Sequence, residues 1–158
     1  MNDMKSVNTV RTFDQAYING QFVPLHGKQL IDLVNPTNNQ VIGKVAMADE
    51  IDARKAVAVA KESFKTFSQT SKEQRMEYLQ RLHDAVARRM DDLIEATVME
   101  YGAPQDRAKG SNNLAASTFL HFKEVLKEFD LVRTVGKSKV VLEPVGVVGI
   151  FTPWNSSA

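Results

Sequence analysis

Residues 145–155, VGVVGIFTPWN, carry the clearest indication of fold class in this sequence. The apolar run from Val145 to Phe151 consists mostly of strand-forming residues, which is typical of a strand buried on both faces in a parallel sheet. Asn155 or Ser156 is a suitable N-cap for a helix after that strand. Because such a strand needs helices and neighbouring strands to cover it, the pattern predicts the opening part of a larger α/β protein.

The segment before this run, residues 49–129, has the pattern of consecutive helices. Asp49 can cap a helix that extends to about Ser68, and Ser71–Gln74 is a capping box that begins the next helix. Gly102 fits the C′ position of a helix, and Pro104 fits the first position of the last one. We expect two apolar stripes at helical spacing to form core. Their residues are Met76, Leu79, Leu82, Val86 and Met90, and Ala115, Phe119, Phe122, Leu126 and Phe129.

Short strands are predicted on either side of these helices. Residues 17–23 read as a hairpin around Asn19-Gly20, because both positions of a two-residue turn must tolerate positive φ. The other predicted strands cover residues 30–34, 40–47, 132–135 and 139–143, the last two being joined at Gly136-Lys137.

Composition excludes several classes of function. The 158 residues include 20 Lys and Arg against 19 Asp and Glu, so the net charge of +1 favours neither nucleic acid nor a membrane surface as partner. The absence of Cys removes disulfides, thiolate metal sites and a Cys nucleophile. His26, His83 and His121 are too widely spaced for a metal motif, so we expect no metal. Residues 1–13 lack a secretory pattern, and we expect a soluble, cytoplasmic protein.

Trp154-Asn155 is the candidate for chemistry, because ligands bind at the carboxyl ends of strands in open α/β sheets. An Asn amide at that place can donate a hydrogen bond to an oxygen that becomes negative in a transition state. From these two residues alone, the cap of the next helix is the more common role for such an Asn. Ser156 and Ser157 lack the Gly-x-Ser-x-Gly elbow of a nucleophilic serine.

The segment from Glu143 to Asn155, EPVGVVGIFTPWN, closely resembles the strand and loop that enter the cofactor site of NAD(P)-dependent aldehyde dehydrogenases. Residues 17–22 and 34–43 resemble the family's opening strands, and residues 49–129 resemble its N-terminal helices. The resemblance implies the N-terminal part of that fold: an incomplete Rossmann-like cofactor domain with N-terminal helices and the start of an oligomerisation arm. It divides the chain into residues 1–130 of the cofactor-binding domain, arm strands at 131–143, and the first core strand and loop at 144–158.

The resemblance also implies roles for individual residues. Asn155 resembles the oxyanion-hole Asn of the family and is the expected catalytic residue. Phe151, Thr152, Pro153 and Trp154 resemble the loop that lines the cofactor cleft near the nicotinamide ribose. The family's Cys nucleophile, general-base Glu and phosphate-binding glycines have no counterpart here, so we expect this chain alone to be inactive and to bind neither NAD nor NADP tightly.

Two hypotheses of function follow. In the first, the chain is the N-terminal part of an oxidoreductase that converts an aldehyde to a carboxylic acid with NAD(P)+, in a parent enzyme that forms a dimer or tetramer. In the second, it is a non-catalytic truncated product or a subunit-interaction module that pairs through exposed strands. The sequence identifies neither the aldehyde nor the choice between NAD and NADP.

Overall fold

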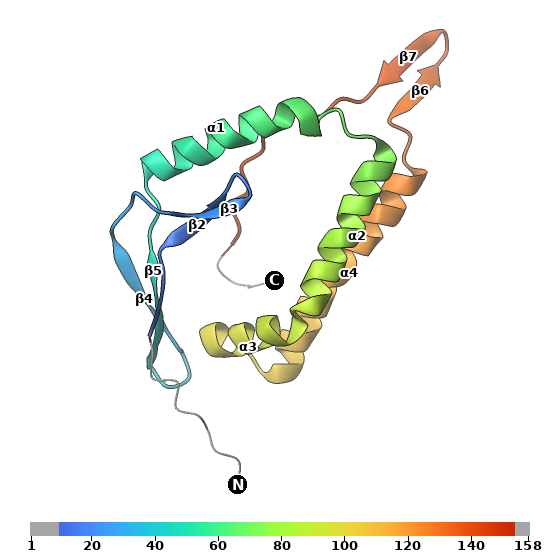
Figure 1. Cartoon of the computed structure of the whole chain (residues 1–158). Coiled ribbons are helices and arrows are strands. Elements are labelled where there is room, and N and C mark those ends of the chain that lie inside the picture. Colours follow the sequence, from blue (N-terminus) through green and yellow to red (C-terminus); the bar gives the residue numbers. More distant parts are fainter. Residues whose placement is uncertain (1–9, 154–158) are drawn as a thin grey trace. The chain divides into compact units, whose positions relative to one another are not determined.

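The computed structural model describes residues 10–153 and is drawn in Figure 1. It divides into two compact units. The first contains the described residues up to Val59 together with Met99–Gly102, and the second contains Ala60–Val98 and the described residues from Ala103 onward.

The first unit consists of five short strands followed by the first part of a helix. The strands are β1 (Arg11–Phe13), β2 (Gln15–Ile18), β3 (Gln21–Pro24), β4 (Leu30–Val34) and β5 (Val41–Ala46). In one sheet β5 lies between β1, which runs parallel to it, and β4, which runs antiparallel. The other sheet is the antiparallel hairpin β2–β3. The buried apolar residues of this unit are Ile18, Leu25 and Ala46.

The hairpin predicted around Asn19-Gly20 is confirmed. Asn19 and Gly20 have φ angles of 55° and 77°, as a two-residue turn of the mirror-image type requires. The turn sets the register in which Ile18 lies opposite Gln21 and Tyr17 opposite Phe22.

Helix α1 (Glu50–Phe67) begins in the first unit with the predicted cap. The Asp49 side chain accepts hydrogen bonds from the backbone N–H groups of Ile51 at 2.9 Å and Asp52 at 3.2 Å. These bonds satisfy donors that a helix start leaves without an intrahelical partner.

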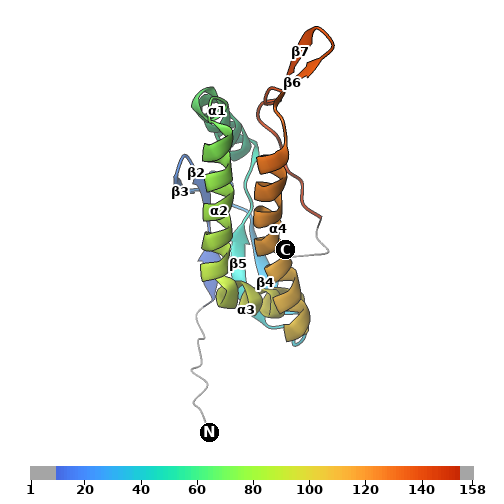
Figure 2. The same ribbon diagram turned by 90° about the vertical axis from the view of Figure 1, so that its right-hand side faces the viewer.

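The second unit is dominated by two antiparallel helices, α2 (Lys72–Arg88) and α4 (Gln105–Glu128), which lie side by side in Figures 1 and 2. Ala108 and Ala116 on α4 are buried, and Ala116 lies at the contact with α2, where a small side chain lets two helices approach closely. Polar contacts also connect α2 with α4. The Lys123 ammonium donates to the Gln80 side-chain oxygen at 2.8 Å, and a His83 ring nitrogen lies 3.0 Å from the Ala116 carbonyl oxygen.

Helix boundaries follow the sequence signals closely. Ser71 and Gln74 form the complete capping box of α2, and α3 (Met90–Tyr101) begins directly after Arg89, the C-cap of α2. Gly102 ends α3 with a φ of 64°. The prediction for Pro104 is wrong by one position: this residue is the N-cap of α4, not its first helical residue, because its ψ of 143° is extended.

The expectation that both apolar stripes form core is wrong for several members. Leu82, Phe122 and Phe129 are exposed, with 54% of the Phe122 surface accessible. The reason is that α2 and α4 pack against each other, and these side chains lie outside that contact. Within the described part of the chain, no large apolar side chain is fully buried.

The prediction of a buried strand over residues 145–151 is also wrong for this chain. No strand is present between residues 142 and 153, and Val145 and Phe151 are 93% and 96% exposed. The backbone leaves the β region at Gly146, whose φ is 117°. In the described part of the second unit, the only strands are β6 (Val132–Val135) and β7 (Ser138–Val141), which pair with each other as a hairpin.

Candidate functional site

The predicted site residues lie at the carboxyl end of the described chain. Phe151, Thr152 and Pro153 are exposed and belong to an extended segment without strand pairing. Trp154 and Asn155 lie outside the described residues. None of these three residues lines the two cavities of the second unit that are described below.

The segment that leads to these residues begins beside a small cavity of about 390 Å³. Its lining comes from the end of α1, the start of α2 and both ends of the β6–β7 hairpin: Phe64, Ser68, Gln69, Arg75, Leu131, Leu142, Glu143 and Pro144. The Leu142 N–H donates to the Leu131 carbonyl at 2.9 Å and closes the base of the hairpin. The Arg75 guanidinium donates to Thr70 at 3.0 Å and to the Ser68 carbonyl at 3.1 Å, so it holds the α1–α2 turn.

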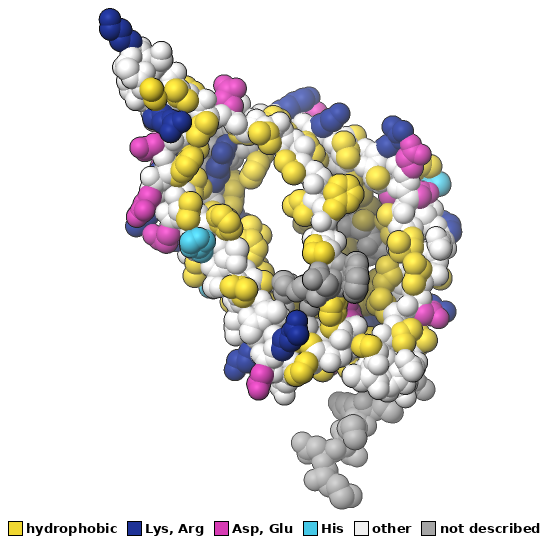
Figure 3. Space-filling model, turned by 180° about the vertical axis from the view of Figure 1, so that it is seen from behind, with side chains coloured by type: hydrophobic (Ala, Val, Ile, Leu, Met, Phe, Trp, Pro, Cys, Tyr) yellow, Lys and Arg dark blue, Asp and Glu magenta, His cyan; other side chains and the backbone are white. Residues whose placement is uncertain are grey.

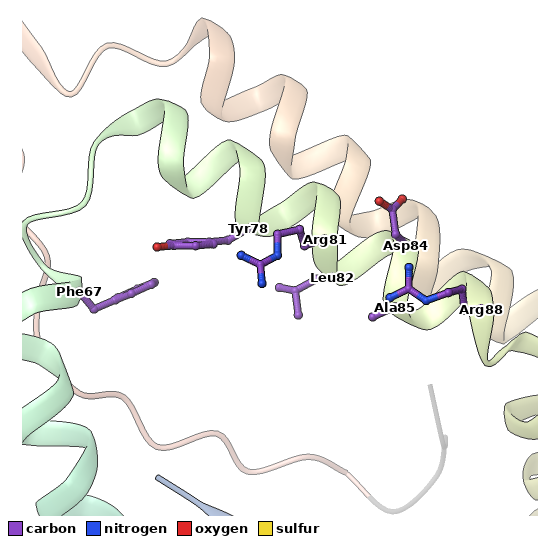
Figure 4. Close-up of a pocket in the computed structure, with 7 residues that line it drawn as sticks. All are labelled: Phe67, Tyr78, Arg81, Leu82, Asp84, Ala85 and Arg88. Carbon is purple, nitrogen blue, oxygen red and sulfur yellow. The ribbon is translucent and has the colours of Figure 1, made fainter. Parts of the chain in front are cut away.

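A larger open groove of about 710 Å³ runs along α2 and is shown in Figure 4. The Phe67 ring from the end of α1 stacks on Tyr78, with centroids 5.8 Å apart and an angle of 22° between ring planes. Leu82 and Ala85 continue this apolar strip along α2. Of these residues, only Leu82 belongs to the apolar stripe that the sequence analysis expected in the core, and the groove itself was not predicted. The signal for it was the recurrence of Tyr78, Leu82 and Ala85 at helical spacing.

Polar side chains border the same groove. Arg81 and Arg88 contribute guanidinium groups, and Asp84 contributes a carboxylate that accepts a hydrogen bond from Gln80 at 2.9 Å. The groove thus combines an apolar floor with a charged margin. It contains no pair of groups in which a base is hydrogen-bonded to a nucleophile, so its arrangement suits packing or binding, not covalent catalysis.

The carboxylates with shifted pKa values serve as structural acceptors at helix starts. Hydrogen bonds from the backbone N–H groups of His26 and Gly27 lower the pKa of Asp52 to about 2. The pKa of Asp49 is lowered mainly by its contact with His26, and that of Glu73 mainly by its own backbone N–H and then by the Ser71 hydroxyl. A carboxylate that acts as a general base needs its pKa raised toward the working pH, whereas the pKa values of these three groups are lowered.

Among residues 10–153, no three His, Asp or Glu side chains gather closely enough to hold a metal ion. No helix in the same range combines the length and apolar character that crossing a membrane requires.

Comparison with known proteins identifies the class to which this chain belongs. The sequence model of the aldehyde dehydrogenase family matches residues 22–158. The 3-succinoylsemialdehyde-pyridine dehydrogenase of a Pseudomonas species is 32% identical over 148 residues, which cover 92% of this chain and 31% of that protein. The chain therefore belongs to the aldehyde dehydrogenase family.

Solved structures agree with this α/β fold. Betaine aldehyde dehydrogenase from Staphylococcus aureus, determined in complex with NAD+, aligns with a TM-score of 0.82 and 27% identity over 89% of this chain and 29% of its own. Aldehyde dehydrogenase C from Pseudomonas syringae, in complex with NAD+ and octanal, gives a TM-score of 0.74 and 28% identity, covering 78% of this chain and 26% of its own. The chain spans about a third of the length of the curated relatives that it matches.

Proposed function

We propose that this chain is part of an oxidoreductase that oxidises an aldehyde to a carboxylic acid with NAD(P)+, through a thiohemiacetal and thioester on a Cys that lies outside these 158 residues. The observation that carries the proposal is the family match over residues 22–158, which includes the Pro-Trp-Asn loop. The general-base Glu likewise lies outside this chain. The parent protein takes a small-molecule aldehyde as substrate, forms a dimer or tetramer and is cytoplasmic.

Asn155 is the one catalytic residue that we assign within the chain. Its side-chain amide donates a hydrogen bond to the oxygen that becomes negative when a thiolate attacks the aldehyde carbon. Such a donor stabilises the transition state more than the ground state, and this difference is what accelerates the reaction. Asn155 cannot begin the reaction, because it supplies neither a nucleophile nor a base.

Phe151, Thr152, Pro153 and Trp154 are assigned to the wall of the cofactor cleft. Two solved relatives contain NAD+, which supports a nicotinamide cofactor for the parent protein and leaves the choice between NAD and NADP to experiment. The three described members of this loop are exposed. We assign the contacts that bind the cofactor tightly to segments outside these 158 residues.

The test is an assay of reduced nicotinamide formation on two preparations, the 158-residue chain and the longest product of its gene. The substrates are octanal and betaine aldehyde, each with NAD+ and with NADP+. We expect no turnover by the 158-residue chain and turnover of at least one aldehyde by a longer product that contains a Cys. A longer product that contains a Cys, binds the cofactor and oxidises no aldehyde would overturn the proposal.

The second candidate function, a subunit-interaction module, is favoured by the exposure of the β6–β7 hairpin. Val132, Val135 and Val141 are all exposed, and Figure 3 shows hydrophobic side chains on the surface of this hairpin below a basic tip. Unpaired strand edges with apolar side chains favour pairing with another chain. This candidate predicts that sedimentation of the 158-residue chain depends on its concentration. A monomer that melts sharply at all concentrations would contradict it.

A further inference from the structure

The tip of the β2–β3 hairpin contains Asn19-Gly20, the single Asn-Gly pair in the sequence. Both residues are exposed and both have positive φ angles. No atom lies within 4 Å of the place where a side chain on Gly20 would begin, so the main chain at this tip is open to solvent on that side. We propose that Asn19 is a site of spontaneous deamidation, which proceeds through a cyclic imide with Gly20.

The proposed reaction needs only water as a co-reactant. The Gly20 backbone nitrogen loses its proton to solvent and attacks the side-chain carbonyl carbon of Asn19. A bond forms between that nitrogen and the carbon, the bond to the side-chain nitrogen breaks, and ammonia leaves with a proton. Water then opens the five-membered ring at one of its two carbonyl carbons, which leaves either Asp or isoaspartate at position 19.

Glycine is the following residue that hinders this attack least, because it has no side chain and its backbone reaches conformations that other residues rarely adopt. The surroundings of the pair add to this freedom. Strands β2 and β3 pair only with each other, over four residue pairs. Because an isolated two-stranded hairpin is marginally stable in water, local opening gives Asn19 the freedom to close the ring.

The chain contains a matched internal control at Asn39. Like Asn19, this residue is exposed and has a positive φ, here 58°. The residue that follows is Gln40, whose backbone N–H donates to the Asn38 side-chain oxygen at 3.0 Å. The nitrogen that would attack is therefore engaged, and the Gln40 side chain crowds it. Asn39 tests whether exposure and backbone conformation alone are sufficient.

The two products would affect the hairpin differently. Asp retains the main-chain length of the turn and adds one negative charge. Isoaspartate routes the main chain through the side-chain carbon and lengthens a turn whose two residues set the register of β2 against β3. The pairing of Tyr17 with Phe22, whose ring centroids lie 5.2 Å apart, would be the first contact to change.

The test is to incubate the purified protein under native conditions at mildly alkaline pH and to follow positions 19 and 39 by peptide mass mapping. Isoaspartate is quantified with an isoaspartyl methyltransferase. Conversion at Asn19 on the order of tenfold greater than at Asn39, with both Asp and isoaspartate as products, is the expected result, because only Asn19 precedes a glycine. An Asn19→Gln variant, whose longer side chain cannot close the five-membered ring, should stay unmodified at that position.

Three results would overturn the proposal. The first is conversion at Asn19 no greater than at Asn39. The second is formation of Asp without isoaspartate, which would indicate direct hydrolysis of the amide. The third is conversion in concentrated urea but none under native conditions, which would show that the folded hairpin does not open enough for the ring to form.

Discussion

The carboxylate of Asp52 accepts the backbone N–H of Gly27 at 3.0 Å, although 25 residues separate them in the chain. It also accepts the N–H of His26 at 2.8 Å, so one side chain in the first turn of α1 holds the loop between β3 and β4. Gly27 permits this approach, because a Cβ at that position would lie 2.0 Å from the Met47 carbonyl oxygen. The start of α1 and the strands of the first unit are thereby held together by a buried carboxylate.

The contribution of Asp52 to stability should depend on pH. Its pKa falls from the ordinary 3.8 to about 2, because backbone N–H groups stabilise the charged form. A lowered pKa contributes stability that is complete well above pH 4 and is lost as the pH falls from about 4 to about 2. Melting temperatures of the wild type and Asp52→Asn, measured across this range, should differ most near neutral pH and converge toward pH 2. Asp49 and His26 are present in both proteins. A constant difference at all pH values would contradict the assignment.

Removing the cap of α2 should weaken the second unit. Ser71→Ala removes the acceptor of the Gln74 N–H and should cost about 1 kcal/mol in the free energy of unfolding, a typical value for an N-cap. Urea denaturation measures this change. Ser71→Thr keeps a hydroxyl at the cap and serves as the matched control. Equal losses in both variants would show that the capping bond is not the cause.

Two glycine-to-alanine substitutions should change the free energy of unfolding in opposite directions. Gly102 has a φ of 64° and a missing Cβ that would lie 3.0 Å from Pro36, so Gly102→Ala should destabilise the protein by about 1–2 kcal/mol. Gly110 lies within α4 with open space around it, so Gly110→Ala should stabilise the protein by about 0.5–1 kcal/mol. Urea denaturation of both variants tests the pair. If Gly102→Ala stabilised the protein, the positive φ of Gly102 would not be the cause of strain that we assign to it.

A buried amide should matter more than its exposed neighbour. Asn112 is buried on α4, and its side chain donates to the Thr97 hydroxyl at 3.0 Å and to the Ala108 carbonyl at 2.8 Å. Asn112→Ala should therefore cost about 1–3 kcal/mol. Asn113→Ala, at an exposed position, is the control and should change stability little. Similar losses at both positions would refute the role of the buried amide.

The proposed role of Asn155 can be separated from helix capping. In an active parent protein, Asn155→Ala should lower kcat by roughly 10²–10³, as the loss of one oxyanion donor does elsewhere. Asn155→Asp keeps an N-cap acceptor and loses the amide donor, so it should lower kcat as well. Steady-state assays of reduced nicotinamide formation measure both effects. Wild-type activity in Asn155→Asp would show that the residue acts as a cap.

Local chemistry allowed much of the fold to be predicted. The turn at Asn19-Gly20 and the caps at Asp49 and Ser71 follow from interactions among residues within a few positions of one another. The candidate site could not be predicted from local chemistry alone, because the role of Asn155 rests on family resemblance. Phe151 illustrates the limit of pattern reading. Its apolar run predicts a buried strand, but burial depends on other strands and helices that pack against it, and in this chain Phe151 is exposed.

The sequence by itself determined where helices and turns begin and end, together with membership of the aldehyde dehydrogenase family. Only the tertiary structure showed that Asp52 holds a loop 25 residues away and that Phe67, stacked on Tyr78, lines an open groove. It also showed that residues 145–151 are exposed in this chain. The physical reason is the sequence distance over which each interaction acts. Caps and turns are set by neighbours along the chain, whereas burial and long-range hydrogen bonds depend on which surfaces meet in space.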